Sequence, residues 1–189
     1  MEAISKTSKV GKFIKLALII VAGSILLTIS AKIKIPFYPV PMTMQTFVVL
    51  FLGMALGPKV GLATVALYLI EGILGFPVFA NSPEKGIGLI YFTGPTMGYL
   101  IGFLIATFLA GSLTSSKNKS NFLKIFFKLL FSVSFIYILG LLWLGFLIGW
   151  DKPIFKLGAQ PFLLAELFKL MLLTFLYPWI IKINIKLFG

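Results

Sequence analysis

The chain has 189 residues, of which 59% are hydrophobic and 12% are charged, a composition outside the range of soluble globular domains. It has no cysteine and no histidine, which excludes disulfides, thiolate metal sites and the usual proton shuttle near neutral pH. The net charge of +12 comes from lysines that lie mostly between apolar runs, so we assign them to membrane topology and anionic lipids rather than to nucleic acid. We expect one membrane domain over residues 1–189, with residues 1–15 as a basic cytoplasmic lead-in.

Six apolar runs follow one another along the chain, and because they are continuous rather than alternating they predict helices instead of a β-barrel. The expected spans are 16–31, 42–56, 60–74, 91–113, 129–150 and 162–181. The second and third are short, since fifteen helical residues reach only about 22 Å against a hydrocarbon core of about 30 Å. The turn Gly57-Pro58-Lys59 joins these two spans. The expected fold is therefore an all-α integral membrane protein with six transmembrane helices.

Small side chains form a stripe along the first span, at the helical spacing i, i+7, i+11 and i+14. They are Ala17, Ser24, Thr28 and Ala31. A stripe of this kind lets another helix approach closely. Two interpretations stay open from the residues alone: the stripe packs against helices of the same chain, or it is the interface with a partner protein.

Two segments between the spans cannot form regular helices. Residues 35–41 contain three prolines, which predict a stiff, extended chain. Residues 76–96 contain a break at 80–86 and the run Gly94-Pro95-Thr96. Non-helical backbone among membrane spans persists only where it is buried in protein or lines a cavity. The second segment is therefore either a surface loop or a binding loop over a cavity, and we expect irregular outer loops that cap a ligand cavity.

The distribution of lysines predicts the orientation. With six spans and a cytoplasmic N-terminus, the outer segments hold Lys32, Lys34, Lys85, Lys152 and Lys156, whereas most of the remaining lysines lie on the inner side. This bias follows the positive-inside rule. It predicts that both termini are cytoplasmic. It also predicts that the Pro-rich segment at 35–41, the loop around Asn81 and the loop around Asp151 lie together on the outer face of the cell membrane.

Glu166 and Lys169 lie inside the sixth span, at a spacing that places them on one helical face. Ionisable groups at membrane depth are costly and usually face the interior of the bundle, so they count as a functional hypothesis. The alternative is an ion pair that satisfies only itself. The sequence has no P-loop, zinc spacing or nucleophile elbow. We therefore expect no enzyme and no cofactor, and any active transport would draw its energy from a partner or an ion gradient.

Several motifs together resemble the BioY family, the biotin-specific S components of energy-coupling-factor (ECF) transporters. They are IPFYPVPMTMQT at 35–46, LGP at 56–58, YL at 68–69, GFPVFA at 75–80, GPT at 94–96 and GYL at 98–100. The resemblance covers about residues 16–170 and implies a six-helix protein that captures biotin from the outer side. It departs from the family pattern at Met97, where the family usually has glycine. It departs again at Glu166, where the family usually has aspartate after a Pro-Gly break.

The resemblance also implies roles for particular residues. The first outer loop, with Pro39, Val40 and Pro41, would form a lid over the site. Biotin has ureido N–H groups that need acceptors and a carboxylate that needs donors. The expected ligand-binding residues are Asn81 and Glu166 for the ureido group, Lys169 for the carboxylate, and Phe79, Tyr91 and Tyr99 for the bicyclic ring.

The implied partners are a transmembrane coupling subunit, which would bind the small-residue stripe of the first helix, and two cytoplasmic ATPases. Two other functions stay open from the sequence. The first alternative is a self-sufficient secondary carrier for biotin or a related small carboxylic acid. The second is a membrane scaffold without a transport function.

Overall fold

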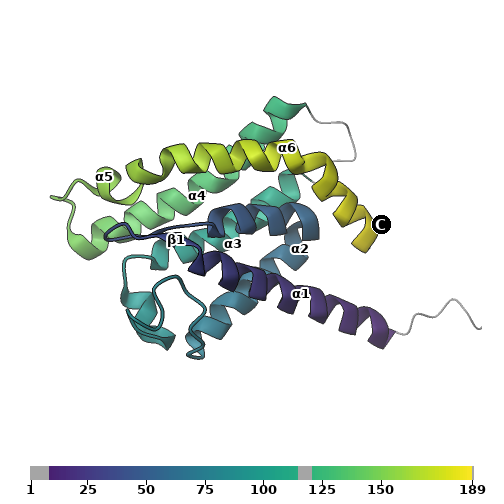
Figure 1. The fold of residues 1–189 in the computed structure, drawn as a ribbon, viewed down its shortest axis with the longest axis horizontal. Coiled ribbons are helices and arrows are strands. Elements are labelled where there is room, and N and C mark those ends of the chain that lie inside the picture. Colours follow the sequence, from purple (N-terminus) through teal and green to yellow (C-terminus); the bar gives the residue numbers. More distant parts are fainter. Residues whose placement is uncertain (1–8, 115–120, 189) are drawn as a thin grey trace, which may run out of the picture.

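The computed structural model describes residues 9–114 and 121–188. Residues 1–8 of the basic lead-in lie outside the described residues, as do residues 115–120. The helices are α1 (Lys9–Lys32), α2 (Gln45–Ile73), α3 (Met97–Thr114), α4 (Phe122–Ile148), α5 (Ile154–Gly158) and α6 (Leu163–Phe188). Two short 3₁₀ helices, η1 (Gly88–Thr93) and η2 (Gln160–Phe162), and the strands β1 (Lys34–Ile35) and β2 (Met42–Thr43) complete the fold (Figure 1). The expected all-α fold is confirmed.

Helix α2 contains the turn that the sequence predicts between the second and third spans. Gly57 has φ +77° and ψ 172°, a conformation that glycine adopts without steric cost. The two arms of α2, before and after this turn, run antiparallel and side by side, as two contacts between them show. Gln45 Nε2 donates to the Tyr68 hydroxyl at 2.8 Å, and a Cβ on Gly61 would lie 3.2 Å from the Gly53 Cα.

Five helices of the described residues are long and apolar enough to cross a membrane, with the folded α2 counted as one. The expected start of the fourth span at residue 91 is wrong. Residues 88–93 form η1, Gly94 is extended, and α3 begins at Met97, because Pro95 has no N–H and restricts the residue before it. The fifth span starts at Phe122 rather than 129, since lysine is a good helix former.

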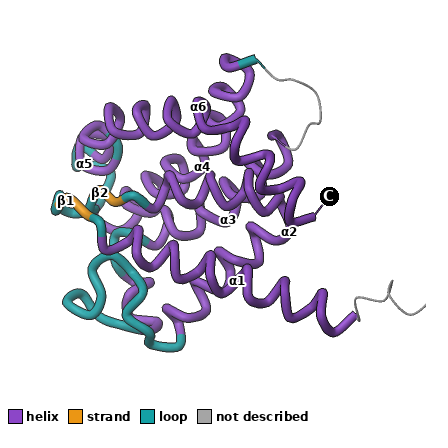
Figure 2. Tube along the Cα trace, turned by 45° about the vertical axis from the view of Figure 1, so that its right-hand side comes forward, coloured by secondary structure: helices purple, strands orange, loops and turns teal. Residues whose placement is uncertain are grey.

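The Pro-rich segment forms a short antiparallel hairpin, in which Lys34 pairs with Thr43 and Ile35 with Met42. We call the end of the bundle that carries this hairpin, η1 and α5 the hairpin end. Figure 2 shows the hairpin and α5 at this end, whereas the C-terminus and the first turns of α1 lie at the opposite end. The first turns of α1 and the last turns of α6 therefore lie on one side of the bundle, as an even number of spans predicts.

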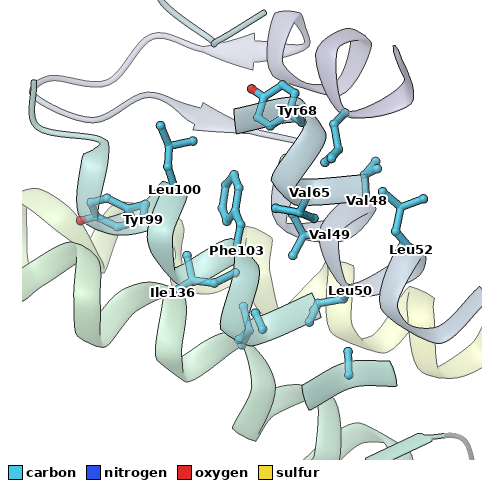
Figure 3. Close-up of a cluster of buried hydrophobic side chains, with 14 of the residues drawn as sticks. Val48, Val49, Leu50, Leu52, Val65, Tyr68, Tyr99, Leu100, Phe103 and Ile136 are labelled. Carbon is cyan, nitrogen blue, oxygen red and sulfur yellow. The ribbon is translucent and has the colours of Figure 1, made fainter. Parts of the chain in front are cut away.

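The helices share one apolar core, and α2 is its centre. In the most apolar window of α2, 61% of the residues are buried, against 22% in α1. Figure 3 shows side chains of α2, α3 and α4 filling this core, with Tyr68, Phe103 and Ile136 among them. Helix α1 therefore lies at the edge of the bundle, and most of its surface is available to lipid or to another protein.

Candidate functional site

A cavity of about 60 Å³ lies at the hairpin end, between the hairpin, the loop at residues 79–80 and the helices α2, α3, α4 and α6. Apolar and aromatic side chains form most of its wall. The polar side chains that line it come from five separate segments of the chain: Thr43, Gln45, Thr46, Tyr91, Thr96, Tyr99, Tyr137, Glu166 and Lys169. An apolar enclosure with a few convergent polar groups is the usual form of a small-molecule site.

The cavity contains a polar cluster around Glu166 and Lys169, which are 4% and 6% exposed. The Lys169 ammonium donates to the Thr43 main-chain oxygen at 2.8 Å and to Thr46 Oγ1 at 2.9 Å, and it lies 3.5 Å from Glu166 Oε2. An ammonium has three N–H groups, so these three partners use all of them. Lys169 thus connects α6 to the hairpin and to the first turn of α2.

The two oxygens of the Glu166 carboxylate differ in their surroundings. Oε2 accepts hydrogen bonds from Thr46 Oγ1 and the Tyr137 hydroxyl, both at 3.0 Å, in addition to the ion pair with Lys169. Oε1 is buried, and none of the described residues donates a hydrogen bond to it. A buried acceptor without a partner carries a desolvation cost. Oε1 is therefore a free acceptor for a ligand N–H or O–H group.

Aromatic rings form one wall of the cavity. Phe79 and Tyr91 stack with their centroids 4.6 Å apart and an interplanar angle of 27°, and Tyr68 meets Phe79 edge to face at 5.4 Å. The Phe79 ring lies where a Cβ on Gly72 would be, within 2.0 Å, so only glycine at 72 leaves room for it. Burial raises the pKa of Tyr91 above its ordinary value, so this hydroxyl is neutral at physiological pH.

Two lysines hold the loop that carries Phe79. Lys32 Nζ donates to the main-chain oxygens of Phe79 and Ser82, both at 2.8 Å. Lys34 Nζ donates to the Ala80 oxygen at 2.6 Å and to Asn81 Oδ1 at 3.3 Å. The loop is thereby fixed to the end of α1 and to β1, and the aromatic wall depends on both.

Of the six residues expected to bind ligand, five line the cavity: Phe79, Tyr91, Tyr99, Glu166 and Lys169. The sixth, Asn81, is not among the lining residues, because its side chain accepts from Lys34. Of the expected lid residues, Val40 and Pro41 line the cavity, and Pro39 is buried without lining it. These positions place the residues around one cavity, and their roles in binding stay a prediction.

Three further polar residues line the cavity without having been predicted from the sequence: Gln45, Thr46 and Tyr137. Gln45 and Thr46 lie in the 35–46 motif, and Tyr137 lies in an apolar helix, where a polar hydroxyl that is buried needs a partner. That partner is Glu166. Membership of the motif, or a hydroxyl group in an apolar helix, therefore pointed to each residue in the sequence. The pairing of Tyr137 with a residue 29 positions away is visible only in the fold.

The small-residue stripe of α1 is divided between the interior and the surface. Ser24 and Ala31 are fully buried, and Ser24 Oγ donates to Glu71 Oε2 on α2. Thr28 is half-buried and Ala17 is exposed. Ser24 and Ala31 therefore pack within the chain, whereas Ala17 is open to a partner and Thr28 is partly so.

The helices and the cavity define a class: a multi-pass membrane protein with a cavity at one end of its helical bundle. Comparison with known proteins agrees. The family model described as "BioY family" matches residues 4–185, and the chain belongs to this family.

The relatives agree in length as well as in sequence. The "Probable biotin transporter BioY" of Pyrococcus horikoshii is 38% identical over 144 residues, which cover 76% of this chain and 82% of that protein. The "Biotin transporter BioY" of Thermotoga maritima is 34% identical over 161 residues, covering 85% and 92%. A crystal structure titled as the S-component for biotin from an ECF-type ABC transporter superposes with a TM-score of 0.74 at 25% identity, over 94% of this chain and 95% of that one.

Proposed function

We propose that this chain is the biotin-capture component of a membrane uptake system, with biotin bound in the cavity beside Glu166 and Lys169. The observation that carries the proposal is the Glu166 Oε1 atom, which is buried without a donor among the described residues, on a side chain that lines the cavity. A ureido N–H of biotin supplies that donor. The Lys169 ammonium is positioned to exchange one of its hydrogen bonds for the ligand carboxylate, and the aromatic wall covers the ring.

Binding requires the cavity to widen. Its volume of about 60 Å³ corresponds to about two water molecules at roughly 30 Å³ each, well below the ~300–1,000 Å³ of typical ligand pockets. We assign the movement to the hairpin with Pro39, Val40 and Pro41, because its two strands pair over only two residues each. In the orientation that the lysines favour, with both termini cytoplasmic, this lid opens to the outside.

Equilibrium binding of labelled biotin to the purified protein in nanodiscs tests the function. We expect saturable, stoichiometric binding that unlabelled biotin displaces. Absence of saturable binding in correctly folded protein would refute the assignment. Biotin uptake by the chain expressed alone, compared with uptake beside an ECF coupling module, separates a capture component from a self-sufficient carrier.

We further propose that the partners are a transmembrane coupling subunit and two ATPases, and that α1 contacts the coupling subunit. No residue of α1 between positions 10 and 22 is buried in the bundle, and this half of α1 lies at the end opposite the hairpin (Figure 1), whose residues line the cavity. We expect Ala17→Trp to block assembly and uptake without changing biotin affinity. Ala63→Trp, on an exposed position of α2, is the matched control. Loss of biotin binding in Ala17→Trp would instead assign this face to internal packing.

A further inference from the structure

An apolar groove of about 650 Å³ runs along the outside of the cavity, between the hairpin and the first turns of α6. Its walls are mainly aliphatic and aromatic, and Ile35, Met44, Ala165 and Phe168 are among the residues that line it. Phe168 is 68% exposed, so the groove opens on the surface that faces the lipid. Its volume is within the range of about 300–1,000 Å³ for small-molecule sites.

The groove and the cavity share one wall. Met42, Thr43 and Lys169 line both spaces, and the hydrogen bond from Lys169 Nζ to the Thr43 oxygen, 2.8 Å long, crosses this wall. The wall is therefore one β-strand and one lysine side chain thick. The Lys169 ammonium, which in the proposed function meets the carboxyl end of the ligand, stands in the wall between the two spaces.

We infer that the site accepts ligands of the biotin class whose carboxyl group is extended by an apolar chain as an amide, with that chain lying in the groove. The inference rests on the proposed function. An amide carbonyl still accepts a hydrogen bond from Lys169, and the chain beyond it leaves the cavity where Lys169 and Thr43 meet. The apolar lining then buries the chain. The occupant that the groove favours is an alkyl chain attached to the ligand, which passes the wall where the hydrogen bond between Lys169 and Thr43 opens. The three residues that the groove shares with the ligand cavity favour this chain over a free lipid chain.

Binding of three ligands to the protein in nanodiscs tests this inference: biotin, biotin N-methylamide and biotin N-hexylamide. The two amides differ only in five methylene groups, and we expect the hexylamide to bind roughly tenfold or more tightly than the methylamide. In Ala165→Phe, which fills the groove, we expect this ratio to fall to about one while biotin affinity stays within about twofold. Ile183→Phe, on an exposed position of the same helix away from the groove, keeps the native ratio and controls for partitioning of the hexyl chain into lipid.

Equal affinity of the two amides in the native protein overturns the inference, and so does a hexyl advantage that Ala165→Phe leaves unchanged. The second result would mean that the chain lies in lipid rather than in the groove. Leu172→Phe fills another part of the same groove and repeats the test where Ala165→Phe fails to bind biotin. Failure of the native protein to bind biotin itself would overturn the proposed function, so the two failures are distinguishable.

Discussion

Replacement of Glu166 by glutamine tests the acceptor role of Oε1 directly. Three donors converge on Oε2, from Thr46, Tyr137 and Lys169. In Glu166→Gln the side-chain oxygen is held at that position, because the amide NH₂ has no lone pair to accept these bonds. The NH₂ group then occupies the position of Oε1 and presents donors to the ligand. The substitution therefore changes the ligand-facing acceptor into a donor while preserving size.

The expected effect follows from the loss of one hydrogen bond to a charged group, about 1.5–3 kcal/mol. At about 1.4 kcal/mol per factor of ten, this is a loss of roughly 10- to 140-fold in biotin affinity. Repulsion between the new amide NH₂ group and the ureido N–H of biotin adds to this loss. We therefore expect the affinity to fall by at least about tenfold. The change is confined to one atom position, and we expect the helices and the cavity to keep their arrangement.

Isothermal titration with biotin and with a biotin methylated at the ureido nitrogen measures this effect. The methylated ligand lacks the N–H that meets Oε1, so Glu166→Gln should weaken it much less than biotin, as a double-mutant cycle requires. The matched control is Glu71→Gln, at the second glutamate of the helical bundle, which accepts from Ser24 and does not line the cavity. Native affinity for biotin in Glu166→Gln, or equal losses for both ligands, would refute the reasoning.

Three further expectations follow from the same geometry. Lys169→Met should weaken biotin roughly tenfold or more and a neutral biotin amide less; equal losses would show that Lys169 does not meet the carboxylate. Lys32→Met removes two hydrogen bonds to loop carbonyls and should speed biotin dissociation roughly tenfold, whereas Lys156→Met, at an exposed position of α5, should not; unchanged dissociation would contradict a positioning role. Cysteines at Glu84 and Asn121, both exposed, should react with an impermeant maleimide from opposite sides of the membrane, and labelling of both from one side would contradict the proposed topology.

The sequence predicted the features that depend on local chemistry. Proline and glycine restrict or widen the backbone conformations open to the chain, so the extended segment at 35–41 and the turn at Gly57 were predictable without a structure, whereas the pairing of strands on either side of that segment was not. Glu166 and Lys169 were readable for a different reason, because the cost of a charge at membrane depth is large enough to stand out in one sequence.

The features that the sequence did not predict depend on partners far along the chain. Tyr137 is one of several aromatic residues in the fifth span, and only the packing of α4 against α6 shows that its hydroxyl meets Glu166. Asn81 was expected to contact the ligand, but Lys34, 47 positions earlier, binds its side chain. Whether a polar loop residue faces a cavity or a neighbouring strand is decided by such tertiary contacts, which the composition of the loop does not encode.

The buried pair on α6 is better explained by ligand binding than by stability. A buried ion pair contributes little to stability, because the desolvation of both charges offsets their attraction. In this chain the desolvation cost of the Glu166 carboxylate is increased, because Oε2 receives every donor that the described residues supply and Oε1 receives none. A cluster that served stability would distribute donors over both oxygens or replace the charges with apolar side chains. In the proposed function a ligand N–H at Oε1 relieves a desolvation cost that the protein alone carries, and we therefore expect the polar end of the ligand at Glu166 rather than in the apolar groove.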